Sequence, residues 1–328
     1  MLDPGVVRLG TRGSRLALWQ THHVRTALER AWPDLRGEPV TYSTLGDRVT
    51  GVALARVGDK GLFTRDLEDA LRAGDIDAAV HSLKDLPTEP ADGLAVGAVL
   101  ERADAREALV SRLDAPLDRL PPGARVGTSS VRRRSQLLAR RPDLHVTDIR
   151  GNVPTRIEKV RQGDYDATLL ALAGLARLDL AHAAAEILPL DVFLPAPGQG
   201  ALAVQVRADD ARMRRLLAPL DHAPSRLATA AERGVLSALG GGCQAPVGAA
   251  TRWLDVDLLE LSTLVAGYDG DTLLRVFAAR PVTSDDDARQ LAEQVANELR
   301  TRGAGAILDD CRRAVRALEP VGAAGDEP

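Results

Sequence analysis

The feature that most constrains the fold of this chain is an alternation of short apolar runs with helical patterns through its first two-thirds. Short apolar runs bounded by turn residues are typical of buried strands, and apolar residues spaced three or four apart indicate helices. The predicted strands are Val6–Leu9, Val40–Ser43, Ala78–Val80, Leu94–Val99, Ala108–Val110, Arg125–Gly127, His145–Ile149, Thr168–Ala171 and Ala201–Val206. The predicted helices are Ser14–Glu29, Phe63–Ala73, Val131–Arg140, Pro154–Gln162 and Leu175–Leu178. This alternation predicts an α/β protein with parallel or mixed sheets covered by helices.

The pattern changes after Asp221 and predicts a separate, smaller α+β domain. Its predicted elements are a helix at Ser225–Leu239, strands at Leu258–Ala266 and Thr272–Ala278, and a last helix at Asp285–Arg302. A chain of 328 residues has enough apolar material for two or three domains. From Leu318 the chain has too little apolar content to pack, so we expect a frayed tail.

Composition makes several classes of protein improbable. Two cysteines are too few for a disulfide framework, and no N-terminal segment has the pattern of a secretion signal, so we expect a cytoplasmic protein. No apolar run approaches the ~20 residues that span a bilayer, so we expect no membrane insertion. The formal net charge of −4 gives no hint of a polyanionic partner, although residues 125–161 hold ten Lys and Arg against three Asp and Glu.

Two predicted strand-to-helix junctions carry the same small hydroxyl residues and arginines. One runs from Gly10 to Ser14 and includes Arg12; the other runs from Gly127 to Ser130 and is followed by Arg132, Arg133 and Arg134. Free N–H groups at helix starts bind anions, and arginine forks match carboxylates or phosphates. A single junction of this kind is usually a plain cap with solvated arginines. Two of them, together with Arg150 and Arg156, favour a polyanionic ligand.

A dense polar turn, His81 to Pro87, follows the predicted strand at Ala78–Val80. Open α/β sheets bind ligands at the carboxyl ends of their strands. Asp85 and Lys84 would make a plain ion pair on an ordinary loop. In a closed site, however, a carboxylate ~4 Å from a developing cation contributes on the order of 4 kcal/mol at an effective dielectric of 20. We expect His81 to be structural, because nothing near it in sequence orients it.

Cys243 follows three consecutive glycines, Gly240 to Gly242. Glycines let the backbone turn sharply and present the next side chain to a neighbouring surface, which favours a chemical role. A small apolar plug in a turn is the other interpretation, since cysteines are often buried, and this segment alone leaves both open. The chain has no metal-ligand spacing, Walker loop, Gly-x-Ser-x-Gly elbow or Gly-x-Gly-x-x-Gly, so metal, nucleotide and hydride chemistry are disfavoured.

These motifs resemble those of the hydroxymethylbilane synthase, or porphobilinogen deaminase, family, in order and at similar spacing over roughly residues 6–312. The matching segments are Val80–Thr88, Val126–Arg133, Ile149–Arg156, Pro197–Ala201, Glu232–Arg233 and Gly241–Pro246. The resemblance implies a transferase that condenses four porphobilinogen molecules head to tail, releases ammonia and then frees linear hydroxymethylbilane with water. It also implies a dipyrromethane cofactor, made from the substrate and held through a thioether by Cys243.

The resemblance assigns roles to individual residues. It implies that Asp85 is catalytic, that Cys243, Lys84, Asp85, Ser130, Arg132, Arg133 and Arg156 hold the cofactor, and that Arg12, Ser14, Lys60, Phe63, Arg150, Arg156, Arg177 and Gln199 bind substrate. It implies a mobile loop at Leu45–Gly58, while the missing metal-ligand spacing leads us to expect no metal. Cys311 has no family role, and we expect it to pack or to be exposed without chemistry.

The resemblance also implies a three-domain fold whose first two domains are similar to periplasmic binding proteins, with a cleft between them. We expect domain 1 at residues 1–102 plus 199–220, domain 2 at 103–198, domain 3 with the cysteine loop at 221–313, and a disordered tail at 314–328. The family implies a monomer that passes its product to a separate uroporphyrinogen-III synthase.

Two other classes of function are each compatible with part of the sequence. A non-catalytic, two-lobed anion-binding protein would share the architecture, but it leaves the glycine-cysteine segment unexplained and the chain shows no secretion signal. A nucleic-acid binder could use residues 125–161, but that segment has no aromatic residues for base stacking and the whole chain has only 3%. We therefore expect an enzyme with no nucleic-acid partner.

Overall fold

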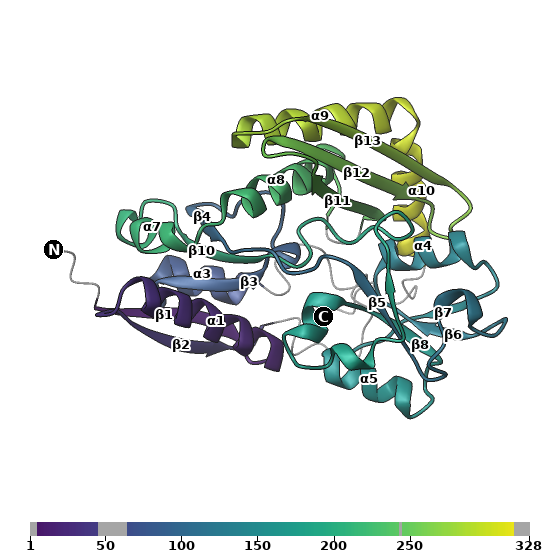
Figure 1. Cartoon of the computed structure of the whole chain (residues 1–328), viewed down its shortest axis with the longest axis horizontal. Helices are drawn as coiled ribbons and strands as arrows, with labels where there is room; N and C mark the ends of the chain where they lie inside the picture. Colours follow the sequence, from purple (N-terminus) through teal and green to yellow (C-terminus); the bar gives the residue numbers. More distant parts are fainter. Residues whose placement is uncertain (1–4, 45–63, 243–244, 318–328) are drawn as a thin grey trace, which may run out of the picture.

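The computed structural model describes residues 5–44, 64–242 and 245–317, and its three sheets confirm the predicted α/β class. Two sheets have five strands each and are mixed, and the third has three antiparallel strands. Figure 1 shows each sheet with its own helices, the two mixed sheets in the lower half of the view and the antiparallel sheet above them. We call these units the first lobe, the second lobe and the C-terminal domain.

The first lobe is built on the strand order β2-β1-β3-β10-β4. Its strands are β1 (Val6–Arg12), β2 (Arg36–Tyr42), β3 (Ala78–Ser82), β4 (Leu94–Val99) and β10 (Leu202–Arg207), and its helices are α1 (Arg15–Ala31), α3 (Arg65–Ala73) and α7 (Ala211–Leu217). Side chains alternate between the two faces of a strand. Val7 and Leu9 therefore pack beside α1 and α7 on one face, whereas Ala79 packs against α3 on the other.

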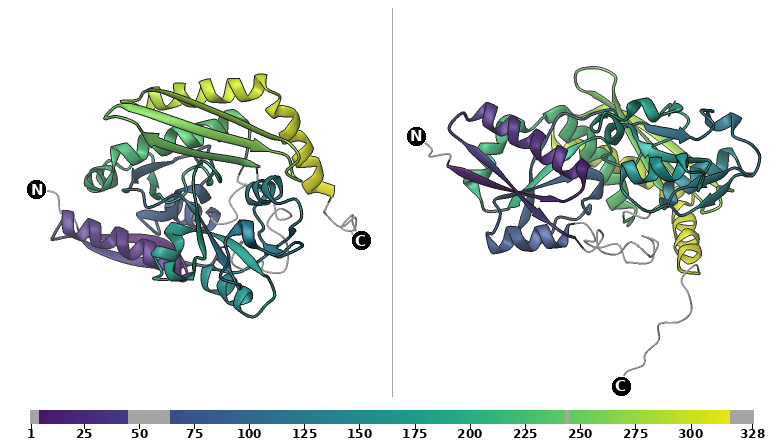
Figure 2. Two further views of the ribbon diagram at one scale, coloured as in Figure 1. Left: turned by 45° about the vertical axis from the view of Figure 1, so that its right-hand side comes forward. Right: turned by 90° about the horizontal axis from the view of Figure 1, so that it is seen from below.

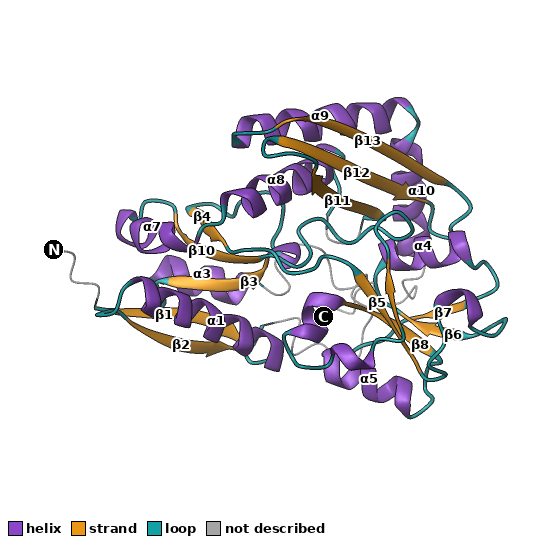
Figure 3. Ribbon diagram, in the orientation of Figure 1, coloured by secondary structure: helices purple, strands orange, loops and turns teal. Residues whose placement is uncertain are grey.

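The second lobe has the order β7-β6-β8-β5-β9. Its strands are β5 (Glu107–Ser111), β6 (Arg125–Gly127), β7 (His145–Thr147), β8 (Ala167–Ala171) and β9 (Glu186–Leu188), and its helices are α4 (Val131–Arg140), α5 (Val153–Arg161) and α6 (Leu172–Ala176). Leu109 and Leu169 face α4, while Ala108 and Leu170 face α5 and α6, so helices cover both faces of the sheet (Figure 3). Each lobe thus has its own apolar core.

The C-terminal domain packs three helices on one face of its sheet. The strands are β11 (Val247–Trp253), β12 (Leu258–Ala266) and β13 (Leu273–Pro281), and the helices are α8 (Ala223–Ala238), α9 (Asp285–Thr301) and α10 (Ala304–Ala317). Leu259 and Leu261 lie in the core with all three helices, whereas Leu264 on the opposite face packs against Leu194 from the connection that precedes β10. Figure 2 shows this domain from two further directions, lying across both lobes.

The chain crosses between the lobes twice, and the two crossings run side by side. The first follows β4 and the second precedes β10, so β10 and α7 return to the first lobe. The Ala103 amide donates to the Gly200 carbonyl. Gly200 has a φ of 90°, and a Cβ there would lie 2.4 Å from the Ala103 oxygen, so only glycine fits this close approach.

A buried carboxylate fastens both crossings to the C-terminal domain. Glu232 of α8 is fully buried and accepts two hydrogen bonds from Arg102 of the first crossing, at 2.7 and 2.9 Å. It also accepts from the amide of Gly198 in the second crossing and from the amide and hydroxyl of Thr251 in β11. A carboxylate taken out of water in this way is stable only with such a complete set of donors.

Several expected elements differ from the structure. Strands β9 and β11 and helices α7 and α10 were not predicted, so the helix at Asp285–Thr301 is not the last one. β9 is only three residues long, and β11 contains Gly248, whose missing Cβ leaves room for Leu194. Helix α10 extends through residues 314–317, which we expected in the tail. Leu45–Gly58 and the chain from Leu318 lie outside the described residues.

No helix among the described residues is long and apolar enough to cross a membrane. The same part of the chain contains no cluster of His, Cys, Asp and Glu that could hold a metal ion. Cys311 is buried in the C-terminal domain, and burial raises the pKa of its thiol to about 11, which keeps it protonated at neutral pH.

We predict that Glu232→Gln lowers the free energy of unfolding by about 3 kcal/mol, because it removes the charge that compensates the largely buried Arg102. Urea-induced unfolding measures this change. Asp286→Asn, at an exposed ion pair with Arg289, is the control and should cost less than about 1 kcal/mol. Equal effects of the two substitutions would contradict the importance of the Glu232 cluster.

Candidate active site

Asp85 lies on a 3-10 turn, η2 (Leu83–Asp85), directly after the interior strand β3. The arrowhead of β3 points toward the second lobe in Figure 1. Leu83 and Leu86 are buried, which leaves Lys84 and Asp85 as half-buried polar groups between them. No described group donates a hydrogen bond to the Asp85 carboxylate, so its oxygens can accept bonds from a ligand.

Lys84 points toward the second crossing, where its Nζ donates to Oε1 of Gln199 at 3.0 Å. Gln199 is fully buried, and its amide nitrogen donates to the Ala105 carbonyl at 2.8 Å. Burial lowers the pKa of Lys84 from 10.5 to about 8, against the attraction of Asp85. The structure thus brings together Lys84, Asp85 and Gln199, which were named separately from the sequence.

A buried cluster from the second lobe lies beside Lys84 and consists of Arg132, Arg133 and Glu107. Glu107 opens β5 and is fully buried; it accepts from Arg132 at 2.6 Å and from Arg133 at 2.6 and 3.1 Å. Burial alone would raise the pKa of Glu107, but the two guanidinium groups hold it well below its usual range. Two cations and one anion leave a net positive charge here.

Arginine donors in this cluster are largely used within the protein. Arg132 also donates to the Leu194 carbonyl and Arg133 to the Leu169 carbonyl, both at 2.8 Å. Glu107 was not predicted as a site residue from the sequence. Its only signal was an acidic residue directly before the apolar run Ala108–Val110, and nothing local shows that its partners lie on a helix more than 20 residues away.

Arg156 adds positive charge close to Arg133 and Arg150. Arg156 donates through Nε to the Gly151 carbonyl at 2.8 Å. Burial, together with repulsion from Arg133 and Arg150, lowers the pKa of Arg156 to about 10. A carboxylate bound here would offset both the desolvation of Arg156 and its repulsion from the neighbouring arginines, because it would pair with a cation that the fold has already removed from water.

Ser14 and Ser130 are helix N-caps in the structure, as their positions predicted. The Ser14 hydroxyl accepts from the Ala17 amide at 3.3 Å, and the Ser130 hydroxyl from the Arg133 amide at 3.4 Å. Asn152 caps α5 in the same way. These helices follow β1, β6 and β7, which are parallel strands, so their amide-rich starts lie at the carboxyl ends of the two sheets.

Arg12 ends β1 and lies close enough to His81 to affect its protonation. Burial, with a further contribution from Arg12, lowers the pKa of His81 to about 4, so the imidazole is neutral at physiological pH. This buried neutral ring agrees with the structural role expected for His81.

Arg177 forms a contact between the lobes. It follows α6 in the second lobe and donates to the Gly200 carbonyl at 2.6 Å. Its guanidinium lies 5.7 Å from the ring centre of Trp19 in α1, and Trp19 stacks on His23. Burial lowers the pKa of Arg177 to about 10, so it remains charged at neutral pH.

Three predicted site residues, Cys243, Lys60 and Phe63, lie outside the described residues. The described chain reaches Gly242 directly before the cysteine, and Gly240 has a φ of 64°, a left-handed conformation that glycine adopts without strain. The sharp turn expected from the glycine run is therefore present at its first residue.

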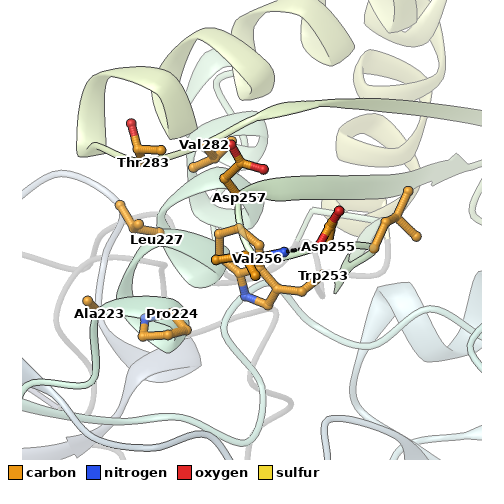
Figure 4. A pocket seen from close by; sticks show the side chains of 10 residues that line it. Ala223, Pro224, Leu227, Trp253, Asp255, Val256, Asp257, Val282 and Thr283 are labelled. Atoms are coloured by element: carbon orange, nitrogen blue, oxygen red, sulfur yellow. Dashed lines mark hydrogen bonds between the residues drawn. The ribbon is translucent and has the colours of Figure 1, made fainter.

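A separate pocket of about 490 Å³ lies in the C-terminal domain (Figure 4). Its lining combines Trp253, Val256, Pro224 and Leu227 with Asp255 and Asp257. None of the residues predicted for the site lines it, and it has no arginine or lysine. It therefore does not offer the cationic environment that a polycarboxylate ligand requires.

The fold and the site define a class: a two-lobed α/β protein in which a half-buried carboxylate lies beside Lys84 of its own lobe and the buried arginines of the other. Residues 7–215 match the family model described as porphobilinogen deaminase, dipyromethane cofactor binding domain, and residues 227–301 match the porphobilinogen deaminase C-terminal domain. The chain belongs to the porphobilinogen deaminase family.

Full-length relatives agree with this assignment. The chain is 46% identical to the porphobilinogen deaminase of Syntrophomonas wolfei over 307 residues, covering 94% of this chain and 99% of that protein. It is 47% identical to the porphobilinogen deaminase of Synechococcus elongatus over 313 residues, covering 94% and 97%. Among solved structures it is similar to the periplasmic VFT2 domain of Bordetella pertussis BvgS, with 17% identity, a TM-score of 0.41, and coverage of 66% of this chain and 87% of that one.

We predict that Lys84 titrates with a midpoint of about 8 instead of the ordinary 10.5. The chain has only three lysines, so reductive methylation with ¹³C gives few NMR signals, and Lys84→Arg identifies the one from Lys84. Between pH 8 and 10.5 the unfolded state holds more protons on this group, so its unfavourable contribution to stability should diminish as the pH rises. A midpoint near 10.5 would contradict the desolvated position of Lys84.

Proposed function

We propose that Asp85 is the catalytic residue of this porphobilinogen deaminase, and that arginines from both lobes bind the carboxylates of substrate and product. The family reaction joins four porphobilinogen molecules head to tail and frees linear hydroxymethylbilane with water. The observation that carries the proposal is the half-buried Asp85 carboxylate, without a described donor, beside Lys84 and the buried cations of the second lobe.

The chemistry requires a group that stabilises positive charge. When the aminomethyl C–N bond of porphobilinogen breaks, its electrons leave with ammonia and the pyrrole becomes an azafulvenium cation. A pyrrole α-carbon then attacks this cation, a C–C bond forms and the α-proton is lost. A carboxylate that accepts a hydrogen bond from the pyrrole N–H binds the ring more strongly as positive charge grows on it. Asp85 therefore favours the transition state over the bound substrate.

Carboxylate binding accounts for the partly buried arginines of the site. Each porphobilinogen carries an acetate and a propionate, so every added ring brings two negative charges. Our proposed substrate contacts among the described residues are Arg12, Arg150, Arg156, Arg177 and Gln199, with the helix start at Ser14. Lys60 and Phe63 complete the set. Arg177 already binds the Gly200 carbonyl, so we assign it a contact at the lobe boundary.

The residues around Lys84 fit the dipyrromethane cofactor. Its carboxylates need fixed cations and N–H donors, and the Arg132–Arg133–Glu107 cluster is positive overall while Arg156 has no described acidic partner. We propose that Lys84, Asp85, Ser130, Arg132, Arg133 and Arg156 hold it and that Cys243 attaches it. When bound, it supplies the primer from which the pyrrole chain grows.

Several broader features of the proposal follow from the family. We propose domains at residues 1–102 plus 199–220, 103–198 and 221–313, which agree with where the chain crosses between the sheets. We further propose a cytoplasmic monomer whose product passes to uroporphyrinogen-III synthase. The family match disfavours a non-catalytic anion-binding protein.

We predict that Asp85→Asn lowers turnover by about 10²-fold or more, because the amide cannot supply the negative charge. The free energy of unfolding should change little, since no described group hydrogen-bonds this carboxylate. Ammonia release and urea-induced unfolding measure the two effects. Asp75→Asn, at an exposed position before β3, is the matched control. Full turnover of Asp85→Asn would remove Asp85 from the proposed role.

We predict that Cys243 carries the cofactor through a covalent bond. Intact mass under denaturing conditions should show the polypeptide plus two porphobilinogen units less two ammonia, and Cys243→Ser should show the bare polypeptide. Cys311→Ser should retain the added mass, because Cys311 is buried with a raised pKa. A wild-type mass that stays bare after incubation with porphobilinogen would contradict the attachment.

A further inference from the structure

We propose that Arg233 is a positioning residue that holds the Asp85 turn from outside its own lobe. This inference rests on the proposed catalytic role of Asp85. Arg233 lies on α8 of the C-terminal domain, and its guanidinium reaches the turn in the first lobe. It donates through one amino group to the carbonyls of Leu83 and Leu86, at 3.0 and 2.9 Å, and through the other to that of Pro87 at 2.7 Å.

These three carbonyls bracket Asp85 along the chain. The turn η2 is only three residues long, and its own backbone supplies a single closing bond, from the Leu86 amide to the Leu83 carbonyl. A short 3-10 turn of this kind has weak internal geometry. The planar guanidinium group of Arg233 binds carbonyls on both sides of Asp85 and therefore fixes the backbone from which the carboxylate projects.

Arg233 is itself held firmly. The preceding residue, Glu232, is the buried carboxylate that joins both crossings to the C-terminal domain. The stem of Arg233 passes close to Gly198, where a Cβ would lie 3.6 Å from its Cδ. Ala231 and Val235 on the same helix are fully buried in the domain core. The guanidinium group of Arg233 thus projects from a part of the molecule with little freedom to move.

The turn has space into which it could relax without Arg233. A cavity of about 40 Å³ lies behind it, lined by Leu86, Pro87, Gln205, Glu68 and Arg233. A shift of the turn into this cavity would displace Asp85, and a misplacement of ~1 Å can lower a rate by about 10²-fold.

The test compares Arg233→Met and Arg233→Lys with Arg226→Met in cofactor-loaded protein, with loading checked by intact mass. Arg226 lies two turns earlier on α8 and pairs with Asp221 and Asp285 at the surface, away from the Asp85 turn. We expect Arg233→Met to lower kcat by about 10- to 100-fold with KM changed less than about threefold, and Arg233→Lys to restore part of kcat. Arg226→Met should retain wild-type kcat.

Hydrogen exchange of the peptide covering residues 82–88 gives a readout that does not depend on catalysis. Exchange there should accelerate in Arg233→Met, less in Arg233→Lys, and not in Arg226→Met or Asp85→Asn. Wild-type exchange in this peptide in Arg233→Met would overturn the positioning role. If Arg233→Met does not fold, Arg233→Lys decides: faster exchange with lower kcat supports the proposal, and unchanged values overturn it.

The two measurements also separate this inference from the proposed function. Faster exchange in Arg233→Met together with an active Asp85→Asn would support the hold on the turn and contradict the catalytic role of Asp85. An inactive Asp85→Asn with wild-type exchange and kcat in Arg233→Met would support the catalytic role of Asp85 and contradict the positioning role of Arg233.

Discussion

The arrangement of the three units depends on the buried carboxylate of Glu232. It pairs with Arg102 of the first crossing and accepts from Gly198 of the second and from Thr251 of the C-terminal sheet. Arg102 in turn donates to the Gln199 carbonyl, so the two crossings are also bound to each other. The next residue on the helix, Arg233, reaches the Asp85 turn. Two successive residues of one helix thus connect the framework of the molecule with its site.

The choice of arginine over lysine in the site follows from desolvation. Burial lowers the pKa of Arg156 and Arg177 to about 10, and both remain fully charged at neutral pH. A similar lowering brings the pKa of Lys84 to about 8, so this lysine begins to lose its proton not far above neutral pH. A site that must hold many carboxylates out of water needs cations that stay protonated when burial lowers their pKa. Only three of the 42 basic residues in the chain are lysines.

Local patterns predicted the fold class and several site positions. Alternating apolar runs indicated parallel or mixed sheets covered by helices, and the hydroxyl residues before helices indicated the caps Ser14 and Ser130. The pairing of Glu107 with the arginines was not predictable, because partners distant in sequence meet only through the order of the strands. Arg177 shows another limit: a motif names the residue, but only the fold shows its bonds to Gly200 across the lobe boundary.

The order of strands has a consequence for synthesis on the ribosome. All strands of the second lobe come from one continuous segment, residues 107–188, so this lobe can complete its sheet as soon as that segment emerges. The first lobe cannot, because β10 lies between β3 and β4 and is made about a hundred residues after β4. Until Arg207 has emerged, two strand edges of the first lobe lack their partner and are exposed to mispairing. The first lobe, whose synthesis begins first, therefore completes its sheet after the second lobe, which is inserted within it.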